Sequence, residues 1–320
     1  MNIKEFTNAP QQMKLIRVVK ANIVNVRKTL MLLLLITLIA SCKAVDLRTD
    51  YLVQNSSDAA LEAKGKRLLE ESYEAMGYPN LKNVKTYSVE ANFTWKGLFL
   101  MMPMNSIPGN NKKDIEFKFA TNTFDGQVTY LEGRKEGKTF GIQSWKGYKI
   151  PEDQSRVIET NRNNYMWGLA TYHYLLEAPM RLRQAEIIKY AGEKVIDGIT
   201  YDLVYVTWGS EAPNNKYDRW LLHINRETKF IDLTELTIGD FFVPMPKGLQ
   251  HGTVLFPKRS KSEIGTYFPD KVIIQLGGLK EEDRYVYYFD LKNFKFNHFD
   301  IETLYPLEGL KKYGDSKPSK

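Results

Sequence analysis

The stretch Tyr87–Lys96, YSVEANFTWK, decides the fold class of this chain. Apolar and polar residues alternate at every position within it. Because successive side chains of a β-strand point to opposite faces, this alternation is typical of a strand with one buried face. The apolar set is rich in aromatic residues: Tyr87, Val89, Ala91, Phe93 and Trp95. The sequence therefore predicts a strand with one buried, aromatic face.

The same alternation recurs along the chain in segments that short turns join. These segments are 115–119, 128–130, 140–142, 201–208, 217–224, 230–238, 272–276 and 285–289. Apolar residues at helical spacing predict a helix from Asp58 to Met76, ended by Gly77 and Pro79, and a second helix over 157–183. We therefore expect a mainly β (α+β) domain, in which roughly ten strands form an antiparallel sheet that curls and is covered on one face.

Composition limits the classes of function. The 320 residues are 43% hydrophobic and 26% charged, which is typical of a folded globular protein. Cys42 is the only cysteine, so disulfides, zinc fingers and iron–sulfur clusters are excluded. The four histidines are not spaced as metal ligands, and no nucleophile elbow or phosphate-binding glycine loop occurs. We expect no cofactor, no metal and no enzymatic activity; a hydrolase stays a lesser alternative, because catalytic carboxylates can lie far apart in sequence.

The formal net charge of +7 is concentrated near the N-terminus. Residues 1–41 hold six basic residues and one acidic residue, so the rest of the chain carries only +2. A nearly neutral body has no broad attraction for nucleic acid. An apolar run of eleven residues, Leu30–Ala40, follows the basic stretch. It is too short to span a membrane and predicts a lipoprotein-type signal peptide over 1–41, starting at Met1 or at Met13.

The signal segment ends in LIASC, which resembles the lipobox of bacterial lipoproteins. Ile39, Ala40 and Ser41 fit its aliphatic and small positions, and Cys42 is the invariant cysteine. The resemblance implies cleavage before Cys42 and lipidation of that residue, which would anchor the protein to a membrane. A buried free cysteine is the alternative interpretation.

Two further expectations follow for the mature N-terminus. Lys43, rather than aspartate, follows the cysteine, which favours the outer membrane, on either its periplasmic or its surface face. Residues 42–59 are polar and include Gln54–Asp58, so we expect a lipidated cysteine followed by a flexible tether.

The aromatic residues on the predicted strands suggest an apolar cavity. The chain holds 19 Tyr, 16 Phe and 5 Trp, and a curved sheet covered by helices can leave space for an apolar ligand. The candidate ligand-binding residues are Tyr87, Val89, Phe93, Trp95, Trp208 and Trp220. Met101 and Met102 would be gate residues, since methionine repacks easily; an ordinary packed loop is the alternative.

Four short stretches, taken in order, resemble the bacterial lipoprotein-carrier family, the fold of LolA and LolB. They are Leu81–Thr86, Tyr190–Gly198, Asp218–Asn225 and Phe296–Asp300. The resemblance implies a strongly curved antiparallel half-barrel over 60–309, with helices covering its concave face and a polar tail at 310–320. In the carriers the cavity holds acyl chains, and no catalytic residues come with the family. The chain departs from the family pattern by insertions around 98–111 and 241–267, and no carrier-type cationic residue is evident.

These features together predict an envelope lipoprotein whose half-barrel binds an acyl chain, such as palmitate, or another apolar ligand. It would carry or sense lipid or lipoprotein. The alternative is a scaffold lipoprotein whose concave face is filled by its own side chains and whose partner is another envelope protein.

Overall fold

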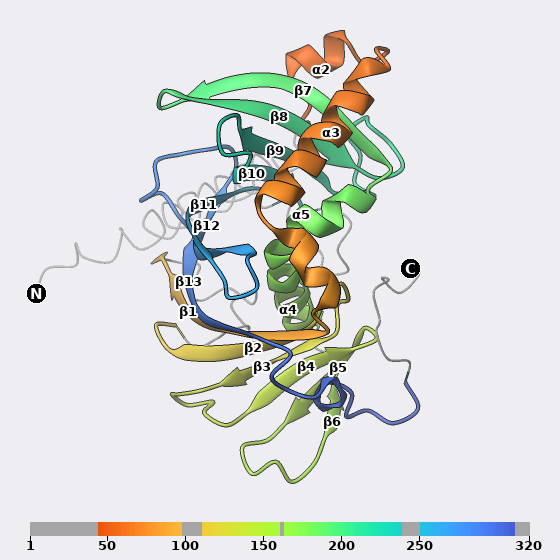
Figure 1. The fold of residues 1–320 in the computed structure, drawn as a ribbon. Helices are drawn as coiled ribbons and strands as arrows, with labels where there is room; N and C mark the ends of the chain where they lie inside the picture. The colour runs from red at the N-terminus through yellow and green to blue at the C-terminus, as the bar shows by residue number, and fades with distance from the viewer. Residues whose placement is uncertain (1–43, 98–110, 161–162, 239–249, 311–320) are drawn as a thin grey trace, which may run out of the picture. The chain divides into compact units, whose positions relative to one another are not determined.

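The computed structural model describes residues 44–97, 111–160, 163–238 and 250–310. Within these residues thirteen strands form one antiparallel sheet (Figure 1). The strands are β1 (Thr86–Trp95), β2 (Asp114–Ala120), β3 (Gly126–Tyr130), β4 (Thr139–Gln143), β5 (Lys146–Ile150), β6 (Ile158–Thr160), β7 (Ile187–Ile196), β8 (Ile199–Thr207), β9 (Arg219–Asn225), β10 (Ile231–Thr237), β11 (His251–Lys261), β12 (Tyr267–Leu276) and β13 (Tyr287–Phe296). The helices are α2 (Asp50–Gln54), α3 (Ala60–Ala75), α4 (Asn163–Leu176) and α5 (Ala178–Arg181), with short 3₁₀ helices η1 (Tyr78–Asn83), η4 (Leu182–Gln184) and η6 (Ile301–Leu304).

The sheet consists of two meanders that meet in its middle. β1 to β6 follow one another in one direction, β7 to β13 return from the other end, and β1 pairs with β13. The edge strands β6 and β7 consequently lie at opposite ends of a curved sheet that does not close (Figure 1). The expected mainly β class with a curved antiparallel sheet is confirmed, although the sheet has more strands than expected.

The additional strands have weak sequence patterns. β6 is only three residues long, and its pairing with β5 shows that the predicted helix over 157–183 begins at Asn163 instead. In β7 the register shifts between Tyr190 and Glu193, which interrupts the alternation. β11 lies within the segment 241–267, by which the chain departs from the carrier-family pattern, yet it pairs on both sides. Pairing between strands therefore defined elements that local pattern did not.

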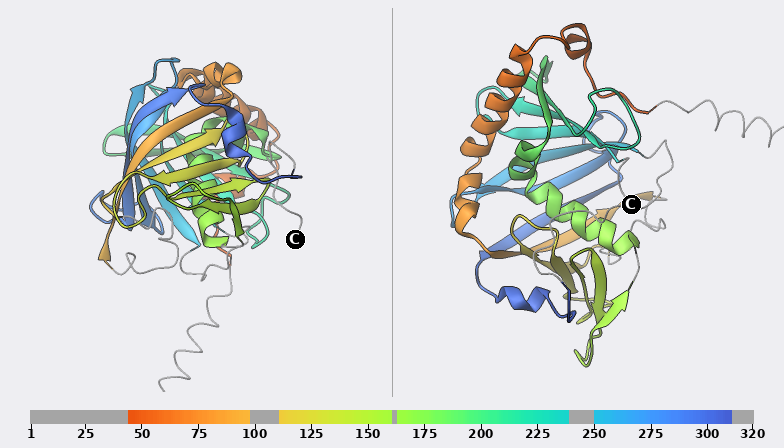
Figure 2. Two further views of the ribbon diagram at one scale, coloured as in Figure 1. Left: turned by 90° about the horizontal axis from the view of Figure 1, so that it is seen from below. Right: turned by 90° about the vertical axis from the view of Figure 1, so that its right-hand side faces the viewer.

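Helices α3 and α4 both lie on the concave side of the sheet (Figure 2). α3 crosses β7 so closely that a Cβ at Gly65 would lie 2.6 Å from the carbonyl carbon of Lys189, so this position requires glycine. Asp58 accepts a hydrogen bond from the amide of Ala60 at 2.8 Å, and Gly77, with a φ of 72°, follows the end of the helix. The glycine stop that the sequence predicts is confirmed, whereas the helix begins at Ala60 rather than at Asp58.

The segment before α3 is more ordered than the predicted flexible tether over 42–59. Leu47 and Leu52 are buried, the latter with no exposed surface. Thr49 caps α2 by accepting from the amide of Leu52, and its hydroxyl donates to the carbonyl of Ala191 on β7. The tether prediction is wrong for these residues, because two leucines in a polar stretch suffice to pack it onto the edge of the sheet.

The middle of the concave face is filled by side chains. Tyr172 of α4 lies with its ring centroid 4.9 Å from that of Phe93 on β1 and 5.4 Å from that of Phe289 on β13. Phe93 and Phe289 in turn stack at 4.7 Å, and all three residues have no exposed surface. We call this aromatic group, with the neighbouring residues of β1 and β2, the packed centre.

Candidate functional site

A cleft of about 430 Å³ opens between the β3–β6 end of the sheet and the first turn of α4. Its apolar lining consists of Tyr130, Phe140, Ile150, Pro151, Ile158 and Tyr165, together with Thr160. Its basic lining consists of Lys135, Lys138, Lys149 and Arg156, and no aspartate or glutamate among the described residues lines it. The volume lies within the range of about 300–1,000 Å³ that is usual for small-molecule sites.

Strand register places an aromatic side chain, a cation and an aliphatic side chain in one row of this cleft. Phe140 on β4 is the partner of Lys149 on β5, which is in turn the partner of Ile158 on β6. Directly opposed residues of antiparallel strands point to the same face. Tyr165 of α4 closes the row, with its ring centroid 4.3 Å from that of Phe140. The cleft thus has an apolar floor with a positive charge directly beside it.

Lys135 joins two walls of the cleft. It lies in the turn between β3 and β4, and its ammonium is 3.5 Å from the hydroxyl of Tyr130 and 3.4 Å from that of Tyr165. Burial raises the pKa of Tyr130 well above its ordinary value, so this phenol stays neutral. The ammonium also lies over both aromatic rings, at 4.8 and 5.4 Å from their centroids. Lys135 therefore connects α4 to the sheet at the cleft.

The first-strand residues that were candidate ligand contacts lie elsewhere, in the packed centre. Tyr87, Val89 and Phe93 have no exposed surface. Tyr87 faces the His173 ring of α4 at 6.0 Å, and Phe93 contacts Tyr172. They would reach a ligand only if α4 moved away, so their role as ligand contacts stays a prediction.

The remaining candidates are also distributed away from the cleft. Trp95 stacks on Tyr287 at 4.1 Å and is 4% exposed. Trp220 stacks on Tyr174 at 5.4 Å, whereas Trp208 is half-buried beside the core. None of the three lines the cleft. Met101, Met102 and Cys42 lie outside the described residues.

Sequence reasoning missed the cleft residues because they belong to short strands. The signal that could have found them is the density of cations around Phe140, with Lys135 and Lys138 before it and Lys149 after it. These cations do not predict a cleft until strand pairing is known, because the same residues could have belonged to a solvent-exposed hairpin.

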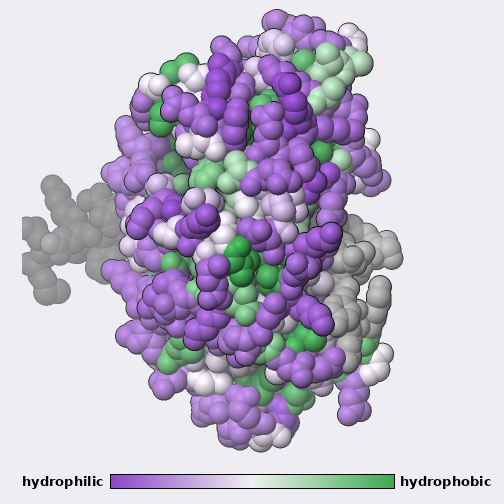
Figure 3. Space-filling view, in the orientation of Figure 1, coloured by the Kyte–Doolittle hydropathy of each residue, from purple (hydrophilic) through white to green (hydrophobic). Residues whose placement is uncertain are grey.

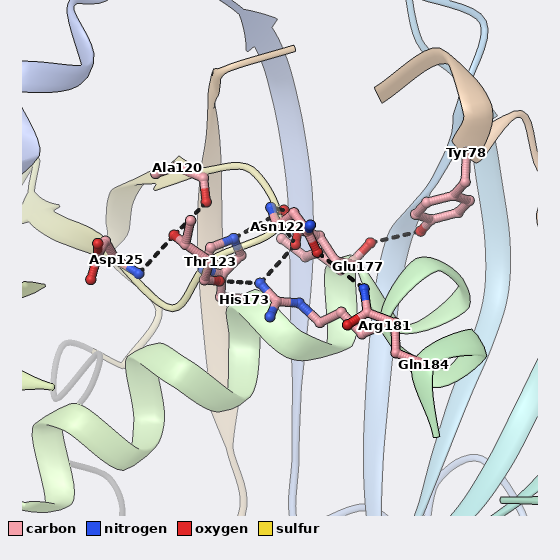
Figure 4. A network of polar contacts seen from close by, with 10 residues as sticks. Tyr78, Ala120, Asn122, Thr123, Asp125, His173, Glu177, Arg181 and Gln184 are labelled. Atoms are coloured by element: carbon pink, nitrogen blue, oxygen red, sulfur yellow. Dashed lines mark hydrogen bonds and ion pairs between the residues drawn. The ribbon is translucent and has the colours of Figure 1, made fainter. Parts of the chain in front are cut away.

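A buried polar network fastens α4 and α5 to the turn between β2 and β3 (Figure 4). Glu177 has no exposed surface; its carboxylate is 3.0 Å from Nε2 of His173 and 2.7 Å from the guanidinium of Arg181. It also accepts from the amide of Asn122 at 3.1 Å, while Arg181 donates to the carbonyl of Thr123. The network satisfies charges that burial would otherwise make costly.

The electrostatics of this network support a structural role. Burial alone would raise the pKa of Glu177, but His173 and Arg181 outweigh it, so the pKa lies below its ordinary value. Burial lowers the pKa of His173, which is therefore neutral near pH 7. Because a carboxylate only accepts, the Nε2 atom of His173 carries the proton. No solvent reaches His173 or Glu177, so a substrate could not contact them in this conformation.

A second polar cluster, which contains two histidines, joins β9, β10 and β11. Glu235 is 3.2 Å from Nε2 of His251 and 3.6 Å from that of His223. The two neighbouring histidines, of which His251 is within hydrogen-bond distance, lower the pKa of Glu235 to about 2. Among the described residues, no group of three or more His, Cys, Asp or Glu side chains is arranged to hold a metal ion. Across those same residues, no helix combines the length and hydropathy needed to cross a membrane.

Comparisons with known proteins yield structural similarity only. No protein-family model matches the sequence, and no curated protein is significantly similar to it. A DUF1329 family protein from Desulfovibrio piger is 10% identical, with a TM-score of 0.46, over 78% of this chain and 99% of its own. A LolA superfamily protein from Nitrosomonas europaea is 11% identical, with a TM-score of 0.46, over 75% of this chain and 96% of its own.

A domain from Vibrio parahaemolyticus, described as an outer membrane lipoprotein-sorting protein, is 8% identical, with a TM-score of 0.43, over 74% of this chain and 94% of its own. The resemblance to lipoprotein carriers that the sequence suggested therefore recurs among similar solved structures. With TM-scores below 0.5, these similarities carry no argument about the ligand or the activity of this chain.

Proposed function

We propose that this protein is an envelope lipoprotein that binds the apolar part of a lipid-like molecule in the cleft between β3–β6 and α4, in order to carry or sense it. The observation that carries the proposal is the cleft itself, about 430 Å³ in volume with an aromatic and aliphatic floor. Concave sites of this size and lining are the usual form of a small-molecule site.

The energetics favour a chain-like ligand. Burial of each methylene contributes about 0.8 kcal/mol, so ten methylenes in the cleft would gain roughly 8 kcal/mol before the cost of ordering the chain. On the face that Figure 3 shows, apolar residues form small separate patches among hydrophilic ones. A recessed apolar floor is therefore a more favourable location for an acyl chain than that outer surface.

The proposal places the anchor at Cys42. Lipidation there is what the lipobox resemblance implies, and Lys43 directly after the cysteine favours the outer membrane. Leu47 is already buried in the folded unit, so four residues separate it from Cys42. A lipid on Cys42 would consequently hold the folded unit by a much shorter tether than the eighteen residues of 42–59.

The test is recovery of a bound lipid from the full chain carrying Cys42→Ser, which removes the thiol that lipidation needs. Organic extracts of the purified protein are analysed by mass spectrometry, and displacement of the neutral dye N-phenylnaphthylamine by hexadecanoate is measured. We expect a stoichiometric lipid or saturable displacement. Ile158→Trp should abolish both by filling the cleft, whereas Val157→Trp, which alters the neighbouring residue outside the cleft lining, should not.

A scaffold function is the second candidate, and the packed centre favours it. Where a carrier-like concavity would hold a ligand, this chain packs Tyr172 edge-on against the stacked rings of Phe93 and Phe289. An empty extract, together with no displacement of the dye by hexadecanoate, would support a protein-interaction role and contradict lipid binding.

A further inference from the structure

We infer that the ligand of the cleft is an anionic amphiphile, with a carboxylate or phosphate group held by Lys149 and Arg156 beside a chain on the aromatic floor. This inference rests on the proposed function and adds the chemical class of the ligand. It follows from an asymmetry of charge: of the residues that the structure describes, four cationic side chains line the cleft, and no carboxylate does.

The four cations are not equivalent. Lys138 lies 3.4 Å from Glu152, an exposed carboxylate that offsets its charge. Lys135 is engaged with the hydroxyls and rings of Tyr130 and Tyr165. Within the part of the chain that the structure describes, Lys149 and Arg156 have no carboxylate within 4.0 Å. These two side chains are therefore the least neutralised of the four, although Arg156 is close enough to the exposed Asp153 to help lower the pKa of that carboxyl.

The position of Lys149 joins the charge to the apolar floor. Its backbone lies directly between those of Phe140 and Ile158 in the sheet, and neighbouring strands are about 4.8 Å apart. An anion at its ammonium would consequently lie beside the row of side chains that includes the ring that a chain would cover. Such a site fits one molecule with a charged end and an apolar body, rather than a free anion or a neutral oil.

Arg156 adds a planar donor suited to oxyanions. It precedes β6 and is exposed, as is Lys149. A guanidinium and an ammonium can share the oxygens of one carboxylate or phosphate, and the fork of arginine binds them in bidentate form. Because both cations are solvent-accessible, their attraction should weaken with added salt.

Protection of the sheet edge is the competing explanation for these charges. β6 is an edge strand, and charged side chains near an edge discourage pairing with another molecule. If protection were their only role, neutralising Lys149 and Arg156 would increase self-association and leave the preference among ligands unchanged.

The experiment measures displacement of N-phenylnaphthylamine from the full chain carrying Cys42→Ser by three ligands with the same chain: hexadecanoate, hexadecyl phosphate and hexadecanol. We expect at least one of the two anions to bind about tenfold more tightly than the alcohol, since hydrogen bonds to charged groups are stronger than those to neutral ones. Comparing the two anions distinguishes a carboxylate from a phosphate ligand. Inorganic phosphate alone should not displace the dye.

The test variant is Lys149→Gln/Arg156→Gln. Its control, Lys82→Gln/Lys295→Gln, also removes two positive charges. Lys82 and Lys295 are exposed and do not line the cleft. We expect the first variant to bind acid, phosphate ester and alcohol within about twofold of one another, whereas the control keeps the preference. Both variants alter exposed side chains, so both should fold.

The outcomes separate this inference from the proposed function. If none of the three C16 ligands displaces the dye, the proposed function fails. If the alcohol binds as tightly as both anions, or if the preference survives in Lys149→Gln/Arg156→Gln, the cleft still binds chains but the anionic class is wrong. If inorganic phosphate competes as well as the C16 ligands, the site is an anion site and the amphiphile is wrong.

Discussion

The packed centre and the cleft lie on the same concave face, yet they are built for opposite purposes. At the packed centre, β1 and β13 contribute aromatic side chains that α4 covers completely with Tyr172. At the cleft, β4 to β6 contribute the row of Phe140, Lys149 and Ile158, and Tyr165 of the same helix packs on Phe140 at the border of the open cleft. One helix thus closes the centre of the face and borders an open cleft near its own first turn. Different residues of α4 can therefore contribute to stability and to ligand binding.

The largest effect should come from breaking the packed centre. Phe93→Ala removes a fully buried ring and leaves a cavity, so it should lower the free energy of unfolding by about 4 kcal/mol, measured by urea denaturation. Phe93→Leu is the control and should cost less than half as much. A loss below about 1 kcal/mol for Phe93→Ala would show that the centre is looser than its contacts indicate.

Glu177→Gln should have the next largest effect, because it leaves Arg181 without its charge partner in the interior. We expect a loss of about 3 kcal/mol at pH 7. The folded-state pKa of Glu177 is depressed, so the stability it contributes is present above the unfolded pKa near 4.5 and is lost as pH falls through the lower folded value. The difference from wild type should therefore shrink below about pH 4; a constant difference across pH would contradict the ionised assignment.

Phe140→Ala should affect ligand affinity as well as stability, unlike the two substitutions at the packed centre and the polar network. The ring is 5% exposed and packs against Tyr165, so its loss should cost about 3 kcal/mol of stability, less than the loss of the fully buried Phe93. Because the ring forms the floor, displacement of the dye by hexadecanoate should weaken by tenfold or more, roughly the value of a lost apolar contact. Unchanged affinity in a folded Phe140→Ala protein would remove the floor from the binding site.

Lys135→Gln should have the smallest effect on folding, about 0.5 kcal/mol or less, because partly exposed cation–aromatic contacts contribute little. It should change the dissociation rate of the ligand instead, since Lys135 connects the turn after β3 to Tyr165 at the cleft. Stopped-flow dissociation of the dye measures this, with Lys146→Gln, outside the cleft lining, as the control. Equal rates in both variants would assign Lys135 no role at the cleft.

Much of the sheet could be predicted from local pattern. The alternation in Tyr87–Lys96 and the glycine stop after Met76 both recur in the structure. The cleft could not be predicted, because its row of Phe140, Lys149 and Ile158 comes from three strands whose register no single segment specifies. The ordered segment around Leu52 was missed for a related reason: its partner, Ala191, lies far along the chain.

The sequence by itself determined the class of the fold, the single cysteine behind an apolar segment and the aromatic face of β1, since each depends on periodicity or composition within one stretch. Only the tertiary structure decided which aromatic residues pack inside the packed centre and which line the cleft. Whether a ring becomes core or binding floor depends on where α4 crosses the sheet, and that crossing is set by contacts such as Glu177 with Asn122. These contacts join residues distant in sequence, so local patterns do not specify them.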